Sequence, residues 1–372
     1  MSNASDLSTS DTALRAGDLP ALIRFSADVI ETLRLDDGIY CFDRDWAENL
    51  NRGRSLRYTL MVALGFARGR AAGYSTPRDP VALADVVLHH AHELTPGDRG
   101  LALWLTTRLD DARAEALVQQ LHRLSDPELE PLEGMEMAWL VIGAALARRA
   151  GIRGADALHE RMLQVLRSRR AERSPLYHHL GTRRGRSMLP NFATQIYSLL
   201  ALAESGMVTN DAIDLGDARR LGDLLVDLRR PDFGWPWLFH AEKGTVVEPY
   251  QVYSVHQDAM APMGYFALAE ATGEPAYAVA GAEGLAWCYG NNELGFHFYD
   301  PVRRFAHRAI KRRGAADRAE LWTNTALALA GTRRRINAGA VEINTTCRPY
   351  HLGWIIEAWA GREHLAVTGA TS

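Results

Sequence analysis

Cysteine is scarce in this sequence. Three cysteines, Cys41, Cys288 and Cys347, occur among 372 residues. Three thiols cannot build the disulfide framework that stabilises many small secreted proteins, and they suit a reducing compartment. The first residues are polar and lack the apolar core of a secretory signal. We therefore expect a cytoplasmic protein.

Long apolar runs and an excess of one charge are also missing. No apolar run reaches the roughly 18 residues that a membrane-spanning helix needs, so the sequence predicts no membrane span. The formal net charge is −3, which gives no global basic field for binding nucleic acid. The expected partner is a small molecule or an oligosaccharide, and the oligomeric state is left open.

Several common catalytic motifs are absent. The sequence has no glycine-rich nucleotide loop, no Gly-x-Ser-x-Gly segment and no His-Glu-x-x-His segment. Asp36–Asp37 and Asp110–Asp111 are isolated pairs without the flanking carboxylates of an Asp-x-Asp-Asp motif. These absences disfavour nucleotide enzymes, serine hydrolases and zinc proteases, and they weaken a terpene cyclase interpretation.

The sequence is rich in amphipathic and apolar helical patterns. Hydrophobic residues make up 47% of the chain and charged residues 23%, as in ordinary globular proteins. Apolar residues recur at steps of three and four, which predicts helices. The predicted helical stretches are 54–73, 80–94, 133–151, 155–170, 190–206, 217–230, 257–273, 275–290 and 351–364. Short strands are expected near 234–250 and 294–310, where aromatic and β-branched residues gather.

A weak internal repeat ends several of these helices. "AALARRAG" (144–151), "ALAESG" (201–206) and "ALAEATG" (267–273) share small residues, a charge and a final glycine. Their spacing of about 60 residues equals one helical hairpin with its loops, and repeats of this kind stack around a shared core. We expect a single domain over residues 19–364, with a disordered segment 1–18 and a flexible tail 365–372.

The helices predicted to be innermost carry distinctive polar residues at their N-terminal ends. Parallel helices in a closed ring would bring these ends to one mouth, whereas an open superhelix would spread them along a groove. This pattern resembles the α/α-toroid superfamily, which includes six-hairpin glycosidases, polysaccharide lyases and sugar epimerases. The resemblance implies an all-α fold, an (α/α) toroid or barrel of helical hairpins with one or two short β-hairpin insertions.

A shorter resemblance covers about 60 residues. The segment "DFGWPW" is followed by tyrosines and by "SVHQDAMAPMGYFALAEATGEPAY", a polar start to an apolar helix. The region is similar to the carboxy-terminal part of uronyl C5-epimerases, which have a Gly-Trp-Pro segment before an inner helix containing Ser and Gln. It implies chemistry on a uronic acid.

The stretch "TVVEPYQVYSVHQDAM" (245–260) supplies the catalytic candidates. They are Glu248, Tyr250, Tyr253, His256 and Asp258. Proton transfer beside a carboxylate, or glycosidic cleavage, needs an acid and a base on opposite sides of the reacting carbon. Burial can move the pKa of Glu or Tyr, and histidine titrates near neutrality. Asp258 is equally suited to cap the following helix.

Substrate-binding candidates surround this stretch. Trp235 and Trp237 flank a proline and offer flat faces to a sugar ring, although each could also belong to the core. Arg303 or Arg308 could clamp a carboxylate. The remaining candidates lie at predicted helix mouths and in adjoining loops: Arg57, Tyr58, Asn191, Gln195, His240, Gln257, Glu293, Arg348, Tyr350 and His351.

"WCYG" (287–290) suggests a metal-dependent alternative. It resembles a motif of lanthionine-synthetase C-like cyclases, in which the cysteine binds zinc. Cys288, Cys347 and His351 would then form a three-ligand set with an open fourth position. The adjacent Cys-His-Gly and upstream His-Gly signatures of those cyclases are absent, and a buried apolar Cys288 is the simpler interpretation.

These observations favour a carbohydrate-active enzyme without a cofactor or metal. It would act on a uronic-acid-containing or related glycan by epimerisation, elimination or hydrolysis in a central toroid pocket. One alternative is a cyclase on the same fold, zinc-dependent or terpenoid. Another is a non-catalytic toroid that binds a glycan or a protein.

Overall fold

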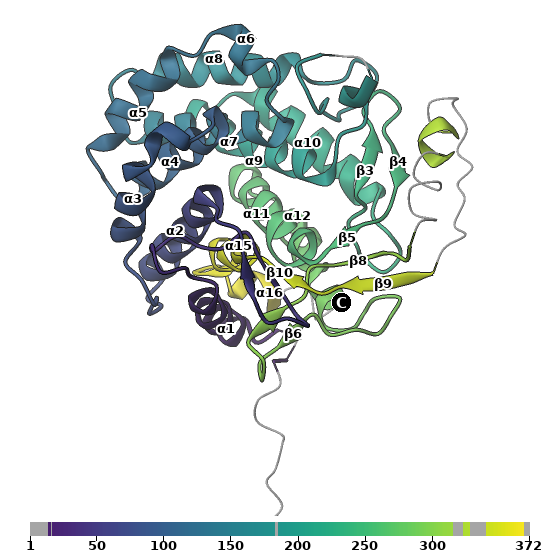
Figure 1. Ribbon diagram of the computed structural model, residues 1–372. Coiled ribbons are helices and arrows are strands. Elements are labelled where there is room, and N and C mark those ends of the chain that lie inside the picture. The colour runs from purple at the N-terminus through teal and green to yellow at the C-terminus, as the bar shows by residue number, and fades with distance from the viewer. Residues whose placement is uncertain (1–13, 16, 183–184, 315–322, 328–339, 368–372) are drawn as a thin grey trace, which may run out of the picture.

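The computed structural model describes residues 14–15, 17–182, 185–314, 323–327 and 340–367, and its main feature is a closed ring of helices (Figure 1). Within the described residues each inner helix packs on the next, and the last returns to the first. In ring order they are α2 (Leu56–Ala71), α4 (Pro96–Arg108), α7 (Gly134–Arg149), α9 (Phe192–Thr209), α11 (Ala261–Thr272) and α15 (Pro349–Trp359). The predicted α/α toroid is confirmed.

A second layer of helices covers the ring from outside. α3 packs on α2, α5 on α4, α8 on α7, α10 on α9, α12 on α11, and α1 on α15. The outer helices are α1 (Leu19–Thr32), α3 (Pro80–His89), α5 (Arg113–His122), α8 (Ala155–Ser168), α10 (Ala212–Asp227) and α12 (Pro275–Ala282). Shorter turns are η1 (Ala91–Glu93), α6 (Asp126–Leu129), η2 (Gly185–Met188), α13 (Leu285–Cys288) and α16 (His364–Val367).

The inner helices are apolar on nearly every side because neighbours contact them all round. Most residues of α2, α7, α9 and α15 are buried. The contact that closes the ring, between α2 and α15, depends on two glycines. A Cβ atom on Gly65 would lie 2.3 Å from the Gly353 carbonyl oxygen, and one on Gly353 would lie 2.8 Å from the Met61 oxygen. We call this backbone contact the seam.

The described residues form four small antiparallel sheets outside the helices. β3 (Leu238–His240) pairs with β4 (Thr245–Glu248), and β6 (Tyr299–Asp300) pairs with β7 (Phe305–Ala306). The other two sheets join distant segments. β10 (Thr346–Cys347) pairs with β1 (Asp43–Asp45), which also pairs with β2 (Asn51–Arg52), while β5 (Val252–Tyr253) pairs with β8 (Ala309–Arg312), which also pairs with β9 (Val341–Asn344).

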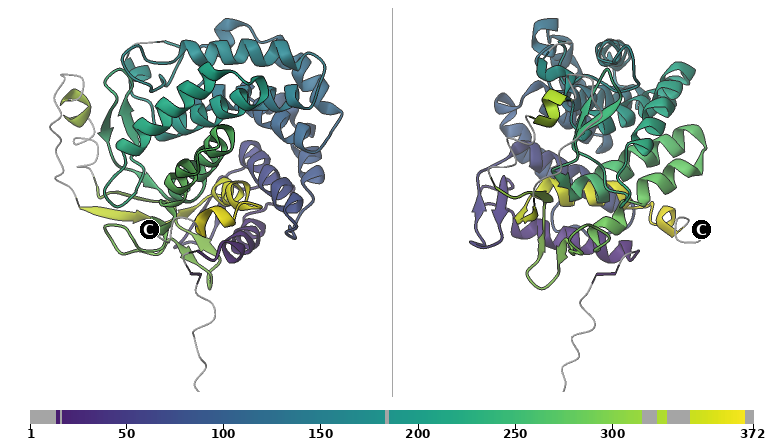
Figure 2. Two further views of the ribbon diagram at one scale, coloured as in Figure 1. Left: turned by 180° about the vertical axis from the view of Figure 1, so that it is seen from behind. Right: turned by 90° about the vertical axis from the view of Figure 1, so that its right-hand side faces the viewer.

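The sheets fix the segments that connect the helices. In the side view of Figure 2 the β1–β2 hairpin, in purple, lies at one end of the ring and α16 at the other. None of the described helices combines the length and the apolar character that a membrane span requires.

Candidate functional site

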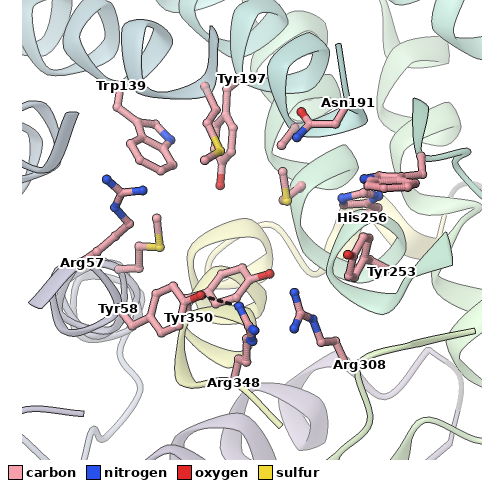
Figure 3. A pocket seen from close by; sticks show the side chains of 15 residues that line it. Arg57, Tyr58, Trp139, Asn191, Tyr197, Tyr253, His256, Arg308, Arg348 and Tyr350 are labelled. Atoms are coloured by element: carbon pink, nitrogen blue, oxygen red, sulfur yellow. Dashed lines mark hydrogen bonds between the residues drawn. The ribbon is translucent and has the colours of Figure 1, made fainter. Parts of the chain in front are cut away.

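The N-terminal ends of five inner segments meet around one pocket (Figure 3). The pocket has a volume of about 230 Å³. Its wall combines arginines, tyrosines, tryptophans and methionines, and consists of Arg57, Tyr58, Met61, Met135, Trp139, Asn191, Ala193, Tyr197, Trp237, Tyr253, His256, Met260, Arg308, Arg348 and Tyr350. The convergence of helix mouths expected for a ring is therefore present.

The first turn of α2 contributes Arg57 and Tyr58. Ser55 begins this helix by accepting a hydrogen bond from the Tyr58 N–H (3.2 Å). The Arg57 guanidinium donates to the carboxylates of Asp98 and Glu136 at the starts of α4 and α7. Arg57 is thereby neutralised, and it links three helix mouths of the ring.

Tyr253 and Arg308 enter the pocket from neighbouring strands. Tyr253 in β5 pairs with Ala309 in β8, so Arg308 lies beside it, with its guanidinium 5.1 Å from the centre of the tyrosine ring. Ser254 fixes this arrangement, because its N–H and its Oγ both donate to the Arg308 carbonyl oxygen at 2.9 Å.

His256 enters the pocket from a π-helical turn, His256–Met260, that leads into α11. Pro262 has no N–H, so it cannot donate to the Asp258 carbonyl as a regular helix would require. That carbonyl instead accepts from Trp359 Nε1 at 2.7 Å. The His256 ring packs against Phe192, with ring centres 4.7 Å apart, and its Nδ1 has no hydrogen-bond partner among the described residues.

The carboxylate of Asp258 holds the π-helical turn in place. Its carboxylate accepts hydrogen bonds from Tyr299 Oη (2.7 Å) and from His351 Nε2 (2.7 Å), and the Cys288 thiol lies 3.5 Å away. Asp258 is fully buried and is not part of the pocket wall. The carboxylate thus ties the turn that carries His256 to α13, β6 and α15.

Two arginines of the pocket have no carboxylate partner in the part of the chain that the structure describes. Among the described residues, no Asp or Glu lies within ion-pair distance of Arg308 or Arg348, in contrast to Arg57. The Nε atoms of both arginines are buried without a hydrogen-bond partner there. Arg348 Nη1 donates to Tyr58 Oη at 2.7 Å. Both guanidinium groups point into the pocket (Figure 3), where they create a positive field suited to an anion.

Burial sets the protonation of the pocket side chains. Burial, the Arg308 charge and His351 lower the pKa of His256 to about 3, so this imidazole is neutral and is a weak base as long as the Arg308 charge is not offset. Burial raises the pKa of Tyr58 to about 12 and also raises the pKa of Tyr253 and Tyr197 above their usual range. These phenols keep their protons at neutral pH and can donate hydrogen bonds.

Several predicted site residues line the pocket, and others do not. Arg57, Tyr58, Asn191, Trp237, Tyr253, His256, Arg348 and Tyr350 form part of its wall. Glu248 lies outside it in a buried ion pair, where Arg312 Nη2 is 2.8 Å from Glu248 Oε1. Tyr250 donates from its hydroxyl to Glu293 at 2.6 Å, also outside the pocket.

Four further candidates have contacts typical of structural residues. Trp235 is fully buried and stacks on Phe192. Gln257 accepts from the Trp235 N–H (2.8 Å) and donates to the Tyr253 carbonyl (2.9 Å). Gln195 bonds both backbone groups of Tyr177 at 2.8 Å. His240 is buried in β3, outside the pocket wall.

The three proposed zinc ligands are not brought together as a set. Cys288 and His351 both contact the Asp258 carboxylate, whereas Cys347 lies in β10 opposite Arg44. No group of three His, Cys, Asp or Glu side chains able to hold a metal is found in the part of the chain that the structure describes. Burial and the nearby Asp258 charge raise the pKa of Cys288 well above its usual value, which disfavours the thiolate that zinc requires.

Two aromatic residues of the pocket wall were not among the sequence candidates. Tyr197 lies one turn inside α9 within an apolar run, and Trp139 occupies the same depth in α7. Such residues are usually core. Figure 3 shows Tyr197 pointing its hydroxyl into the pocket, and only the ring geometry reveals this.

Comparison of the sequence with protein-family models and with curated proteins finds no match. Comparison of the structure does. A sugar epimerase from a ruminal bacterium is 9% identical and matches with a TM-score of 0.62, covering 92% of this chain and 98% of that one. An unsaturated glucuronyl hydrolase specific for heparin is 10% identical, with a TM-score of 0.58 over 94% of this chain and 97% of that one.

An α-1,6-mannanase of Salegentibacter in complex with mannotriose is also similar, with 10% identity, a TM-score of 0.50 and coverage of 94% and 100% of the two chains. These solved structures are members of the six-hairpin α/α-toroid superfamily, as the sequence pattern predicted. At such low identity the likeness establishes the fold. The chain has the six-hairpin α/α-toroid fold of that superfamily.

Proposed function

We propose that this protein is an enzyme that moves a proton on a uronic-acid-containing glycan, by epimerisation or elimination, within the toroid pocket. The observation that carries the proposal is the pair Arg308 and Arg348, two cations without a carboxylate partner among the described residues, facing an aromatic pocket. The solved structures with the same fold include a sugar epimerase and a glucuronyl hydrolase.

The pocket supplies the groups that this chemistry needs. A guanidinium that binds the carboxylate of a uronate stabilises the enolate formed when the adjacent carbon loses its proton. A bound carboxylate would also offset the positive charge of Arg308, which helps to lower the pKa of His256. Substrate binding would thus raise the basicity of the nearby imidazole.

Proton donors lie around the same pocket. Tyr253 neighbours His256, with ring centres 5.0 Å apart, while Tyr197 and Tyr350 lie on other sides of the pocket (Figure 3). A proton taken by His256 and returned from another side would invert the carbon, which is epimerisation. Loss of the neighbouring glycosidic oxygen instead, protonated by a tyrosine, would be elimination.

Hydrolysis is the less favoured reaction. It ordinarily uses two carboxyl groups that flank the glycosidic bond, and the described pocket wall contains no Asp or Glu. Its ionisable side chains are arginine, tyrosine and histidine. The side chains named here suffice for the proposed proton transfer, so the proposal includes no cofactor.

The test is turnover of a panel of uronate oligosaccharides in deuterated water. Epimerisation incorporates deuterium at the carbon beside the carboxylate, seen by NMR, and elimination forms a double bond, seen by ultraviolet absorbance. We expect Arg308→Ala and Arg348→Ala each to lower kcat/KM by about 100-fold. Arg303→Ala is the matched control, because Arg303 packs over Trp46 outside the pocket wall.

Other outcomes would contradict the proposal. Turnover of neutral glycans alone would remove the role of the two arginines. Binding of uronates without any product would leave a glycan-binding toroid rather than an enzyme. Equal losses in Arg303→Ala and the two pocket variants would show that the arginines act through stability instead of substrate binding.

A further inference from the structure

A second cavity adjoins the pocket. We call it the side cavity; its volume is about 360 Å³, and it shares Arg57 and Tyr58 with the pocket wall. Its other lining residues include Phe42, Arg54 and Glu93. The side cavity is therefore a direct neighbour of the pocket, and the two meet at Arg57 and Tyr58.

An exposed aromatic ring forms part of the side cavity. Phe42 has 42% of its surface exposed, and its ring lies nearly parallel to that of Tyr58, with an interplanar angle of 16° and ring centres 5.4 Å apart. An exposed aromatic face beside polar groups suits the apolar face of a sugar ring.

The local backbone holds Phe42 in this position. The Phe42 N–H donates to the Arg52 carbonyl at 2.9 Å. Gly53 has a φ of +66°, and a Cβ atom there would lie 2.9 Å from the Phe42 Cβ. A glycine at this point lets the segment before α2 pass closely behind the aromatic residue.

The charges of the side cavity are balanced. Arg54 donates to Asp37 (2.9 Å) and to Glu93 (3.2 Å), and Arg57 is bound by two carboxylates. Arg348 also lies close to Phe42, with its guanidinium 4.2 Å from the centre of the Phe42 ring, but it points into the pocket, where a bound uronate would take up its charge (Figure 3). Paired charges still offer hydrogen bonds to hydroxyl groups.

We propose that the side cavity is a binding site for a second, neutral sugar unit. This inference rests on the proposed function and deepens it. The substrate is then at least a disaccharide, with its uronate in the pocket and its neutral neighbour stacked on Phe42. The neighbour contributes affinity and does not take part in proton transfer.

The test compares uronate monosaccharides with uronosyl–hexose disaccharides by calorimetric titration. The probes are glucuronate, galacturonate and mannuronate, each alone, joined to a neutral hexose, and joined to a second uronate. The readout is the ratio of the monosaccharide Kd to the disaccharide Kd. We expect a ratio of at least about 10 for the neutral hexose, which corresponds to about 1.4 kcal/mol, and a smaller one for the second uronate.

Variants then test whether Phe42 causes the tighter binding of the disaccharide. Phe42→Ala should bring the ratio close to one, and Phe42→Trp should preserve it because a flat ring remains. Phe233→Ala is the control, since Phe233 is also exposed (39%) but is not part of either cavity lining. Thermal melting of each variant checks that it folds.

The outcomes separate this inference from the proposed function. If monosaccharide uronates bind and the neutral disaccharides gain nothing, or if Phe42→Ala keeps the gain, the side cavity is not a sugar site while the proposed function stands. A larger gain from a second uronate overturns the neutral assignment. If no probe binds, the proposed function and this inference both fail.

Discussion

At the scale of single residues, burial decides which polar side chains are available for chemistry. Glu248 and Tyr253 lie five residues apart in one polar stretch. Glu248 forms a buried ion pair with Arg312, whereas Tyr253 faces the pocket. A carboxylate taken out of water needs such a partner, and breaking the pair is strongly destabilising. Glu248 is therefore better placed to hold the β4–β8 region than to transfer protons.

His307 provides a residue-scale prediction about pH. It lies among aromatic rings, 4.7 Å from that of Trp46, and burial lowers its pKa to about 4, with Asp300 opposing. An unfolded histidine binds its proton near pH 6.5, so the unfolded chain gains protons first as the pH falls. Stability from this neutral histidine is complete above about pH 6.5 and is lost progressively down to about pH 4.

The free energy of unfolding of the native chain should fall on going from pH 7 to pH 5. We expect that fall to be smaller in His307→Phe by about 2 kcal/mol. Urea unfolding at the two pH values measures this difference. His92→Phe is the control, because the side chain of His92 is 78% exposed. An unchanged pH dependence in His307→Phe would mean that folding does not lower the pKa of His307.

At the scale of elements, the π-helical turn before α11 determines where His256 points. One carboxylate, that of Asp258, fixes the turn through Tyr299 and His351. Removing it leaves two buried donors without their acceptor, and each unsatisfied buried group costs about 1–3 kcal/mol. The turn would then lose the contacts that hold it against α15 and β6.

We expect Asp258→Ala to lower the free energy of unfolding by about 3 kcal/mol and to lower kcat more than it raises KM, because His256 is displaced. Asp258→Asn should lose less, since the amide oxygen can still accept one hydrogen bond. Cys288→Ala removes only a weak thiol donor near the same carboxylate and serves as the control. An Asp258→Ala protein with native kcat would show that the turn keeps its shape without the carboxylate.

Many of the helices were predictable from sequence, but α1, α4 and α5 lie outside the predicted helical stretches. The side chains that form the pocket were only partly predictable. The periodicity of 133–151 and 190–206 anticipated α7 and α9, because apolar spacing depends on the chain alone. Trp235 and Trp237 show the limit. They flank one proline and look equivalent, yet Trp235 is in the core and Trp237 lines the pocket. The direction of a loop side chain depends on contacts with distant segments, which the local sequence does not contain.

At the scale of the whole molecule, the ring is closed by the seam between α2 and α15. Arg348 and Tyr58 meet across it, so the same contact that completes the fold also completes the pocket. Overpacking a tight interface typically costs 1–3 kcal/mol. A methyl group at Gly353 would push directly against the backbone of α2, near Met61.

We expect Gly353→Ala to lower the free energy of unfolding by about 2 kcal/mol and to weaken uronate binding. Gly216→Ala is the matched control. Gly216 lies in the outer helix α10, where a Cβ atom would be 3.5 Å from the flexible end of Arg220, and alanine there should add about 0.5–1 kcal/mol. Urea unfolding measures both. Equal effects of the two substitutions would show that α2 and α15 can move apart at the seam without loss of stability.

The seam also has a consequence for the order in which the chain is made. Synthesis runs from the N-terminus, and domains fold as their segments emerge. The helix that closes the ring, and with it Arg348 and Tyr350, is made after the other five inner helices named above. Until then the apolar flanks of α2 and α11 lack the α15 surface that covers them. The growing chain therefore exposes apolar surface that only α15 covers, and no sugar can bind in a complete pocket before α15 has been made.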